Sequence, residues 1–156
     1  MNNPFDDYLA LLEQMSDELA HLSELAVQKT DAVMKNDLAA LDQVLKQEQA
    51  SSLTFRGLEQ KQTALLNATG LMDVKLSSLV ENYPPRKRIA CKEVVEKLQN
   101  QYDIYKCRAE VARNTLECNL HEIDKILASA SASQAGPGYE AKMPDVPDGM
   151  KTDFRA

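Results

Sequence analysis

Residues 86–129 read RKRIACKEVVEKLQNQYDIYKCRAEVARNTLECNLHEIDKILAS, a stretch without proline or glycine. Apolar side chains recur in it at steps of three and four residues, the spacing that gathers them on one face of an α-helix. The pattern predicts a single helix from about Pro85 to Ser129, roughly 65 Å long at ~1.5 Å per residue. Its apolar face comprises Cys91, Val95, Leu98, Tyr102, Tyr105, Ala109, Ala112, Leu116, Leu120, Ile123 and Leu127.

Proline and glycine divide the rest of the chain. Prolines lie at positions 4, 84, 85, 137, 144 and 147, and only Gly57 and Gly70 precede residue 136. Because proline interrupts helices, long helices are also expected before the pair at 84–85. The first should run from about Pro4 to Lys35, and the second from about Leu38 to Thr69, where Gly70 is a good stop.

The first helix carries a heptad-like apolar seam. Its members are Phe5, Tyr8, Leu12, Met15, Leu19, Leu22, Ala26 and Val33, and Lys29 interrupts it. The second helix is polar over residues 47–52, where its own stripe should pass, so this layer is either loosely packed or open to water. Asn36-Asp37 is either a tight turn, since Asn tolerates left-handed angles and Asp caps helices, or part of one continuous helix.

The remaining segments complete an all-α prediction. A short helix is expected over Val74–Glu81, ended by the proline pair. Residues 130–156 lack periodicity and hold three Pro and three Gly, which predicts a disordered tail. We therefore expect an elongated antiparallel helical bundle or coiled coil of three long helices plus a short one over residues 1–129. The last helix should overhang one end of the bundle, because it is the longest.

Composition excludes several classes of function. The chain has 156 residues, 18 basic and 24 acidic, for a net charge of −6, which argues against a general nucleic-acid binder. No segment approaches the ~18 consecutive apolar residues that a membrane span needs. Three cysteines are an odd number, and none lies in a C-x-x-C motif, which favours reduced thiols in a cytoplasmic protein.

The motifs for catalysis and metal binding are incomplete. Glu18-x-x-His21 is a single copy of a motif that di-metal bundles need twice, and the seam places His21 on the outer face. Cys118-x-x-His121 lacks further ligands, because Cys107 lies three turns, or ~16 Å, away. We therefore expect no metal, no cofactor and no enzyme, with Cys107 and Cys118 buried or half-buried as small apolar side chains.

The long apolar face of the last helix suits interaction with another helix. Together with an overhang and a flexible tail, it offers a surface for an amphipathic partner. Alternatively, the whole face is internal core or a homodimer seam. The basic run Arg86–Arg88 is a candidate contact for an acidic partner, or it lies in the solvated start of the last helix.

Two stretches carry a family resemblance. Residues 33–50 read VMKNDLAALDQVLKQEQA, and residues 55–61 read FRGLEQK. They resemble FlgN-type flagellar export chaperones, in which a turn of a small residue plus Asp separates a Leu/Glu-rich helix from a second helix with a Leu-Glu-x-Lys/Arg-like patch. Here Asn36-Asp37 occupies the turn and Leu58-Glu59-Gln60-Lys61 the patch, and the last helix resembles the family's amphipathic C-terminal helix. Ala112 stands where the family often has Asn.

The resemblance implies a non-enzymatic cytoplasmic chaperone. Its implied clients are the hook-associated proteins at the hook–filament junction, whose terminal amphipathic helices it would cover and deliver to the export gate. On this reading the client-binding face comprises Leu98, Tyr102, Tyr105, Leu116, Leu120, Ile123 and Leu127. Related chaperones dock on the gate through a Tyr-containing C-terminal segment, which points to Tyr139. The alternative is a coiled-coil scaffold or homodimeric adaptor without a secreted client.

Overall fold

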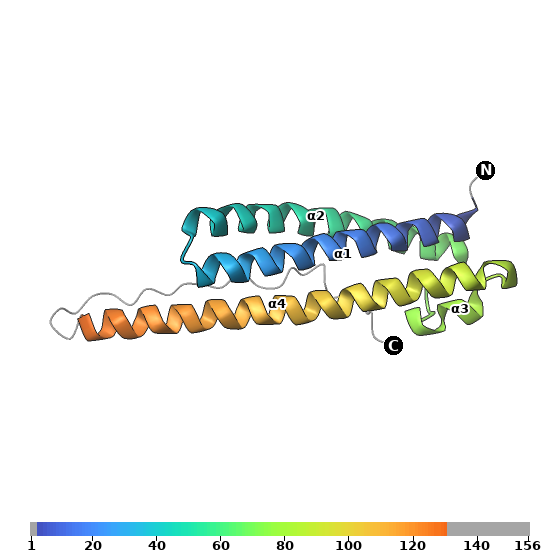
Figure 1. The fold of residues 1–156 in the computed structure, drawn as a ribbon. Helices are drawn as coiled ribbons and strands as arrows, with labels where there is room; N and C mark the ends of the chain where they lie inside the picture. The colour runs from blue at the N-terminus through green and yellow to red at the C-terminus, as the bar shows by residue number, and fades with distance from the viewer. Residues whose placement is uncertain (1–2, 131–156) are drawn as a thin grey trace.

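The structure, a computed structural model, describes residues 3–130 as an elongated helical bundle (Figure 1). Within that range it has no strand, and the predicted architecture of three long helices plus a short one is confirmed. Two 3₁₀ turns, Leu76–Ser78 and Pro85–Lys87, precede the third and fourth helices. The helices are α1 (Pro4–Met34), α2 (Leu38–Thr69), α3 (Leu79–Asn82) and α4 (Arg88–Ala130).

Helix α1 is the central element of the bundle. Both α2 and α4 pack along it, and neither packs closely on the other. Successive long helices run antiparallel, so α1 and α4 point in the same direction (Figure 1). Two contacts show the parallel register of these helices. Arg108 Nη1 lies 3.8 Å from Glu24 Oε1, and farther along Asn119 Nδ2 donates to the Val33 carbonyl at 3.1 Å.

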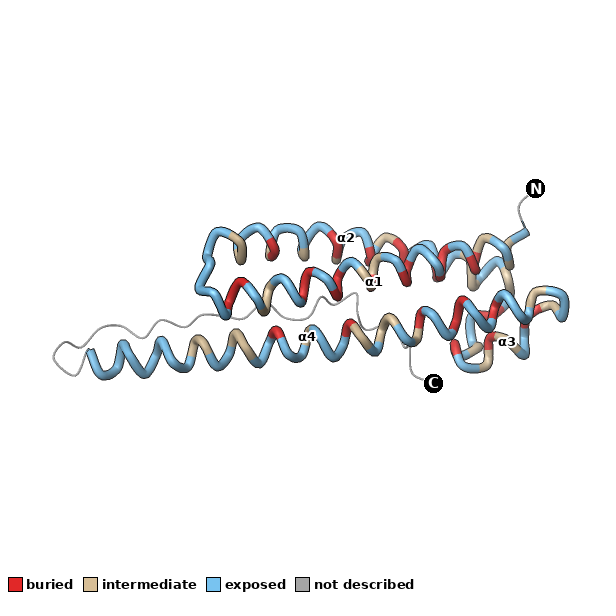
Figure 2. Tube along the Cα trace, viewed as in Figure 1, coloured by how far each residue is buried: buried red, intermediate tan, exposed pale blue. Residues whose placement is uncertain are grey.

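The core lies around α1 and is densest toward the end that carries α3 (Figure 2). From α1, the predicted seam is buried except for Phe5, which is half-buried, and Lys29. Burial along α4 declines toward its C-terminal end, and most of its buried residues precede residue 100. The buried residues of α4 are Cys91, Val94, Val95, Leu98, Tyr105 and Ala112.

A tight turn, and not a continuous helix, separates α1 from α2. Asn36 adopts left-handed angles with φ of 54°, which Asn tolerates better than most residues. The Asp37 carboxylate then caps α2 by accepting a hydrogen bond from the Ala40 amide at 3.0 Å. Gly70, with φ of 74°, ends α2 as expected. Local chemistry therefore sets both ends of α2.

The helix predicted over Val74–Glu81 is wrong in its extent. The chain forms instead a 3₁₀ turn and then the single α-helical turn α3. The α-helical part begins only at Leu79, and Pro84 accounts for its end at Asn82, because it keeps Tyr83 extended, at ψ of 153°. Tyr83 then packs inward, where its hydroxyl donates to the Phe5 carbonyl at 2.8 Å and its ring meets that of Phe5 edge-on, with centroids 5.1 Å apart.

Two residues of the basic run Arg86–Arg88 form contacts within the molecule. Lys87 forms an ion pair with Asp6 in the first turn of α1. Arg88 donates from Nε to the Tyr83 carbonyl at 3.1 Å and from Nη2 to the Glu81 carbonyl at 3.0 Å. These contacts fasten the start of α4 to α1 and to the connecting segment.

Two further expectations concern the membrane and the tail. No helix in residues 3–130 is long and apolar enough to cross a membrane. The disordered tail predicted for residues 130–156 lies outside the described residues except for Ala130, the last residue of α4. The division into a bundle domain over 1–129 and a tail therefore stays a prediction.

Candidate functional site

The interface between α1 and the middle of α2 is polar, and its side chains are paired. Lys29, which interrupts the α1 seam, lies 3.2 Å from the Glu48 carboxylate, and these side chains are only 13% and 23% exposed. The hydroxyl of buried Ser51 donates to the Glu18 carboxylate. Polar groups that are buried and paired hold one register without an apolar stripe. This layer is thus neither loosely packed nor simply open to water.

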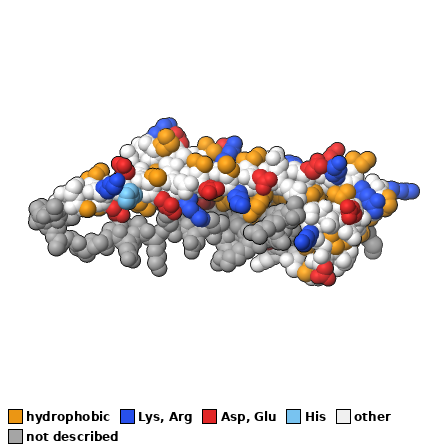
Figure 3. All heavy atoms as spheres, turned by 90° about the horizontal axis from the view of Figure 1, so that it is seen from below, with side chains coloured by type: hydrophobic (Ala, Val, Ile, Leu, Met, Phe, Trp, Pro, Cys, Tyr) orange, Lys and Arg blue, Asp and Glu red, His pale blue; other side chains and the backbone are white. Residues whose placement is uncertain are grey.

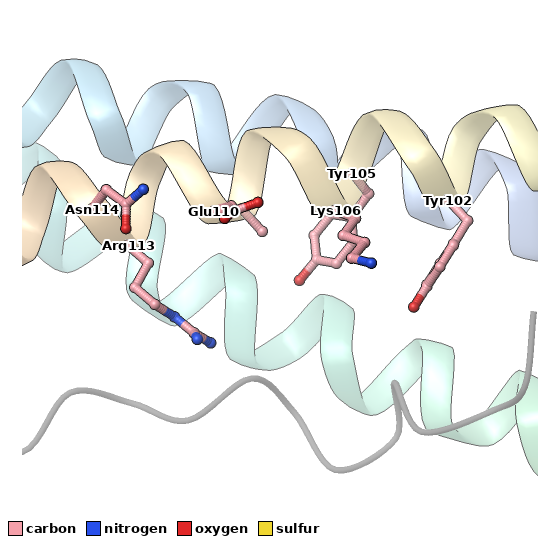
Figure 4. A pocket seen from close by; sticks show the side chains of 7 residues that line it. Tyr102, Tyr105, Lys106, Glu110, Arg113 and Asn114 are labelled. Atoms are coloured by element: carbon pink, nitrogen blue, oxygen red, sulfur yellow. The ribbon is translucent and has the colours of Figure 1, made fainter. Parts of the chain in front are cut away.

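A hollow of about 400 Å³ lies along α4 on the side that faces α2. Its described lining consists of Tyr102, Tyr105, Lys106, Ala109, Glu110, Arg113 and Asn114, all from α4. Figure 4 shows the side chains of Tyr102, Lys106 and Arg113 directed toward α2. We call this hollow the α2–α4 groove. The name gives its position only, because no α2 residue is part of the described lining.

The electrostatic environment of Tyr105 includes a residue of α2. Burial raises the pKa of its hydroxyl to about 12, and the nearby carboxylate of Glu48 on α2 acts in the same direction. The guanidinium of Arg113 opposes this shift. Tyr105 therefore remains a neutral phenol at physiological pH, and Glu48 of α2 lies close enough to α4 to act on it.

The structure divides the seven predicted client-binding residues by burial. Leu98 and Tyr105 are 0% and 6% exposed and belong to the core, so their side chains offer little surface to a partner. The half-buried residues are Tyr102, Leu116 and Leu120. The exposed residues are Ile123 and Leu127. The predicted face is thus one continuous stripe that passes from the core to the surface along α4.

The exposed part of this stripe lies where α4 extends beyond the other long helices (Figure 1). Asn119 already contacts the last turn of α1, and every residue from 121 to 130 is exposed (Figure 2). The predicted overhang is therefore confirmed. Ile126, 63% exposed, joins the predicted Ile123 and Leu127 there. Sequence reasoning missed Ile126, although its spacing of three residues from Ile123 was the available signal.

Seen from below, apolar side chains reach the surface among charged ones over the distal part of α4 (Figure 3). Ile123 and Leu127 are 45% and 53% exposed. Single exposed apolar residues are ordinary, but several at helical spacing on one face form a surface for another helix. We call Leu116, Leu120, Ile123, Ile126 and Leu127 the distal face.

The burial predicted for Cys107 and Cys118 is wrong. Cys107 and Cys118 are exposed. Each follows a member of the apolar face by two residues, a rotation of about 200° that directs it away from α1. Cys91, which lies in the face itself, is buried, and burial raises the pKa of its thiol to about 11. Neither exposed thiol has the buried environment that was expected.

The candidate metal motifs are dispersed. Glu18 is engaged by Ser51, and His21 is exposed. In the described part of the chain, no group of three His, Cys, Asp or Glu side chains is placed to hold a metal ion. The structure therefore brings together none of the ligand sets that the two short motifs suggested.

A second hollow, of about 340 Å³, lies between α2 and residues 72–79 at the opposite end of the bundle. Tyr8 and Gln62 line it, with Gln62 Nε2 donating to the Tyr8 hydroxyl at 3.2 Å. Glu59 lines it as well, and burial raises the pKa of this carboxyl to about 7, against the opposing charge of Arg56. The hollow is far along the bundle from the distal face and depends on the connecting segment.

Replacing Glu59 with glutamine is expected to flatten the pH dependence of stability. Because the folded pKa exceeds the unfolded value of 4.5, the folded state binds the proton more tightly. The wild-type free energy of unfolding should therefore fall as the pH rises from about 4.5 to about 7, by about 1 kcal/mol after solvent screening. Urea denaturation at several pH values measures this. Glu13→Gln, an exposed site on α1, is the control, and an unchanged profile for Glu59→Gln would contradict the assignment.

Comparison with known proteins identifies a family for the chain. The family model described as FlgN protein matches residues 1–142, which include every described helix. Neither the curated proteins nor the solved structures contain a match to the chain. The family match covers most of the 156 residues. The chain therefore belongs to the FlgN family, a family of flagellar-assembly chaperones.

Proposed function

We propose that this protein is a cytoplasmic, non-enzymatic export chaperone for hook-associated flagellar proteins. It binds their terminal amphipathic helices, prevents premature assembly at the hook–filament junction and delivers them to the export apparatus. Family membership supports the chaperone role. The observation that supports client binding is the distal face, an apolar stripe that continues onto the exposed part of α4 beyond the end of the bundle.

The physical task of such a chaperone matches this surface. A client helix that later packs in a filament exposes an apolar stripe before assembly, and another amphipathic helix can cover it. Full burial of an Ile or Leu side chain contributes about 1.5–3 kcal/mol relative to exposure. The half-buried residues Leu116 and Leu120 continue the stripe toward the α2–α4 groove, so a bound helix would contact both regions.

Replacing Leu120 and Ile123 together with aspartate is expected to weaken client binding more than a hundredfold. Each new carboxylate would have to be buried in an apolar interface without a partner. Both positions are half-buried or exposed in the unbound chain, so the helix content should be retained. The measurement is co-purification with purified hook-associated proteins, with circular dichroism to confirm the fold.

Ile89→Asp with Val111→Asp is the matched control, since these residues are 77% and 51% exposed and lie on the side of α4 away from the distal face. This pair should bind clients as the wild type does. Normal binding by the Leu120 and Ile123 variant would show that the distal face is not the client site. A concentration-independent dimer that the same variant dissociates, with no client bound, would support the scaffold alternative.

Tyr139 is proposed as the residue that docks the loaded chaperone on the export gate. It lies outside the described residues, and the proposal rests on the resemblance to related chaperones. Tyr139→Ala should leave client co-purification unchanged and reduce the hook-associated protein secreted into the culture medium at least several-fold. Tyr139→Phe, which keeps the ring, serves as the control. Normal secretion by Tyr139→Ala would remove this residue from the docking step.

A further inference from the structure

The basic residues of α4 differ in whether they have an ionic partner. On the side that faces α1, Lys97 Nζ lies 3.4 Å from Asp17, and Arg108 Nη1 lies 3.8 Å from Glu24. Lys106 and Arg113, which line the α2–α4 groove, form no ion pair with any residue in the range 3–130. The cations that face the groove are thus available to a partner, while those that face α1 hold the bundle.

The position of these two cations has a regular geometry. They are seven residues apart, which places them about two turns, or ~10.5 Å, from one another on the same edge of α4. Figure 4 shows both directed to the side of α2. The one carboxylate in the described lining of the groove is Glu110, on α4 itself. Glu48, on the α2 side, is already held by Lys29 at 3.2 Å.

We infer that the α2–α4 groove accepts an amphipathic helix that carries two carboxylates seven residues apart along one edge, which pair with Lys106 and Arg113. The inference deepens the proposed function and rests on it, because the occupant is the client helix that the distal face binds. Residues seven apart in a helix are separated by about two turns and lie on the same side, so two such carboxylates share one edge of the partner helix.

The two regions of α4 have different physical roles in this arrangement. The distal face supplies apolar burial, whereas exposed ion pairs contribute little affinity and chiefly set orientation and register. Pairing at Lys106 and Arg113 would fix the direction in which the client helix lies along α4. It would also discriminate against helices whose matching edge is basic, because like charges would then be brought together.

The test uses the full-length chain and three synthetic amphipathic helices with one shared leucine face. Their two edge positions, seven residues apart, carry Glu, Gln or Lys. The Glu peptide should bind about tenfold more tightly than the Gln peptide, and the Lys peptide more weakly than both. At about 0.5 M salt the differences should shrink, because screening shortens the range of exposed charges.

Variants of the chain assign the effect to the two residues. Lys106→Gln with Arg113→Gln should abolish the preference among the peptides, and Lys106→Glu with Arg113→Glu should reverse it. Lys97→Gln with Arg108→Gln is the matched control, because it removes the same charges from the side that faces α1 and should preserve the preference.

The outcomes separate this inference from the proposed function. Equal affinity for the three peptides overturns the inference, while the proposed function stands if Leu120→Asp with Ile123→Asp still abolishes binding of hook-associated proteins. Normal client binding by that variant overturns the proposed function instead. A preference for the Glu peptide that is absent in the wild type and arises only after replacement of Asp145, Asp148 and Asp153 with asparagine would assign the two cations to the chain's own tail and overturn the inference.

Discussion

Replacing Leu19 with alanine is expected to lower the free energy of unfolding by about 2–5 kcal/mol. Leu19 lies on α1 and is 0% exposed, within the core cluster that includes Phe55 of α2 and Leu98 of α4. Truncation would remove buried apolar surface and leave a cavity that a well-packed core closes only in part. Urea denaturation followed by circular dichroism measures the loss, which is read at an unchanged slope.

The magnitude follows from the central position of α1. Because α2 and α4 pack on α1 and not closely on one another, a cavity in α1 weakens both interfaces at once. Val27→Ala is the control, since Val27 lies on α1 but is 44% exposed, and its effect should be within about 0.5 kcal/mol. A loss below about 1 kcal/mol for Leu19→Ala would contradict the assignment of α1 as the element that joins the bundle.

Replacing Tyr83 with alanine is expected to cost about 3–5 kcal/mol, the range for truncation of a buried aromatic residue. Tyr83 is 1% exposed and carries the short segment between α3 and α4 into the core. Its ring packs edge-on against Phe5, and its hydroxyl donates to the Phe5 carbonyl at 2.8 Å. Thermal and urea denaturation of the variant measure the loss.

Tyr83→Phe separates the hydrogen bond from the packing. This substitution keeps the ring and removes the hydroxyl, so it should cost only about 1 kcal/mol. If the phenylalanine variant is as unstable as the alanine variant, the hydrogen bond to Phe5 is the dominant interaction and the packing argument fails. If neither variant is destabilised, the segment before α4 does not contribute to the stability of the bundle.

The helix ends were predictable because they depend on local chemistry. Asn36, Asp37 and Gly70 each act within a few residues, through left-handed angles or a capping hydrogen bond. The heptad spacing in α1 predicted its buried seam for the same reason, since the spacing follows from helix geometry alone. The extent of α3 was less predictable, because only one side of that segment has a strong stop signal.

The division of the α4 face into core and exposed parts could not be read from its pattern. Leu98 and Leu127 occupy equivalent positions in the same apolar stripe, yet one is 0% and the other 53% exposed. The difference depends on where α1 ends beside α4, which is a property of the assembled bundle. The pairing of Lys29 with Glu48 depends in the same way on the register of α1 and α2. In the sequence, therefore, Lys29 and Glu48 each appeared only as a polar residue that interrupts an apolar stripe.

The parallel arrangement of α1 and α4 has a consequence for biosynthesis. Residues that meet across this interface are far apart in the chain, as Asp17 and Lys97 are, which lie 80 positions apart. At about 5–20 residues per second, the ribosome needs several seconds or more to supply the second partner. During that interval α1 and α2 can form a hairpin, but the flank of α1 that receives α4 stays uncovered. A foreign amphipathic helix present at that moment would compete with α4 for this flank, so the order of synthesis leaves the central helix with one apolar side open until α4 is made.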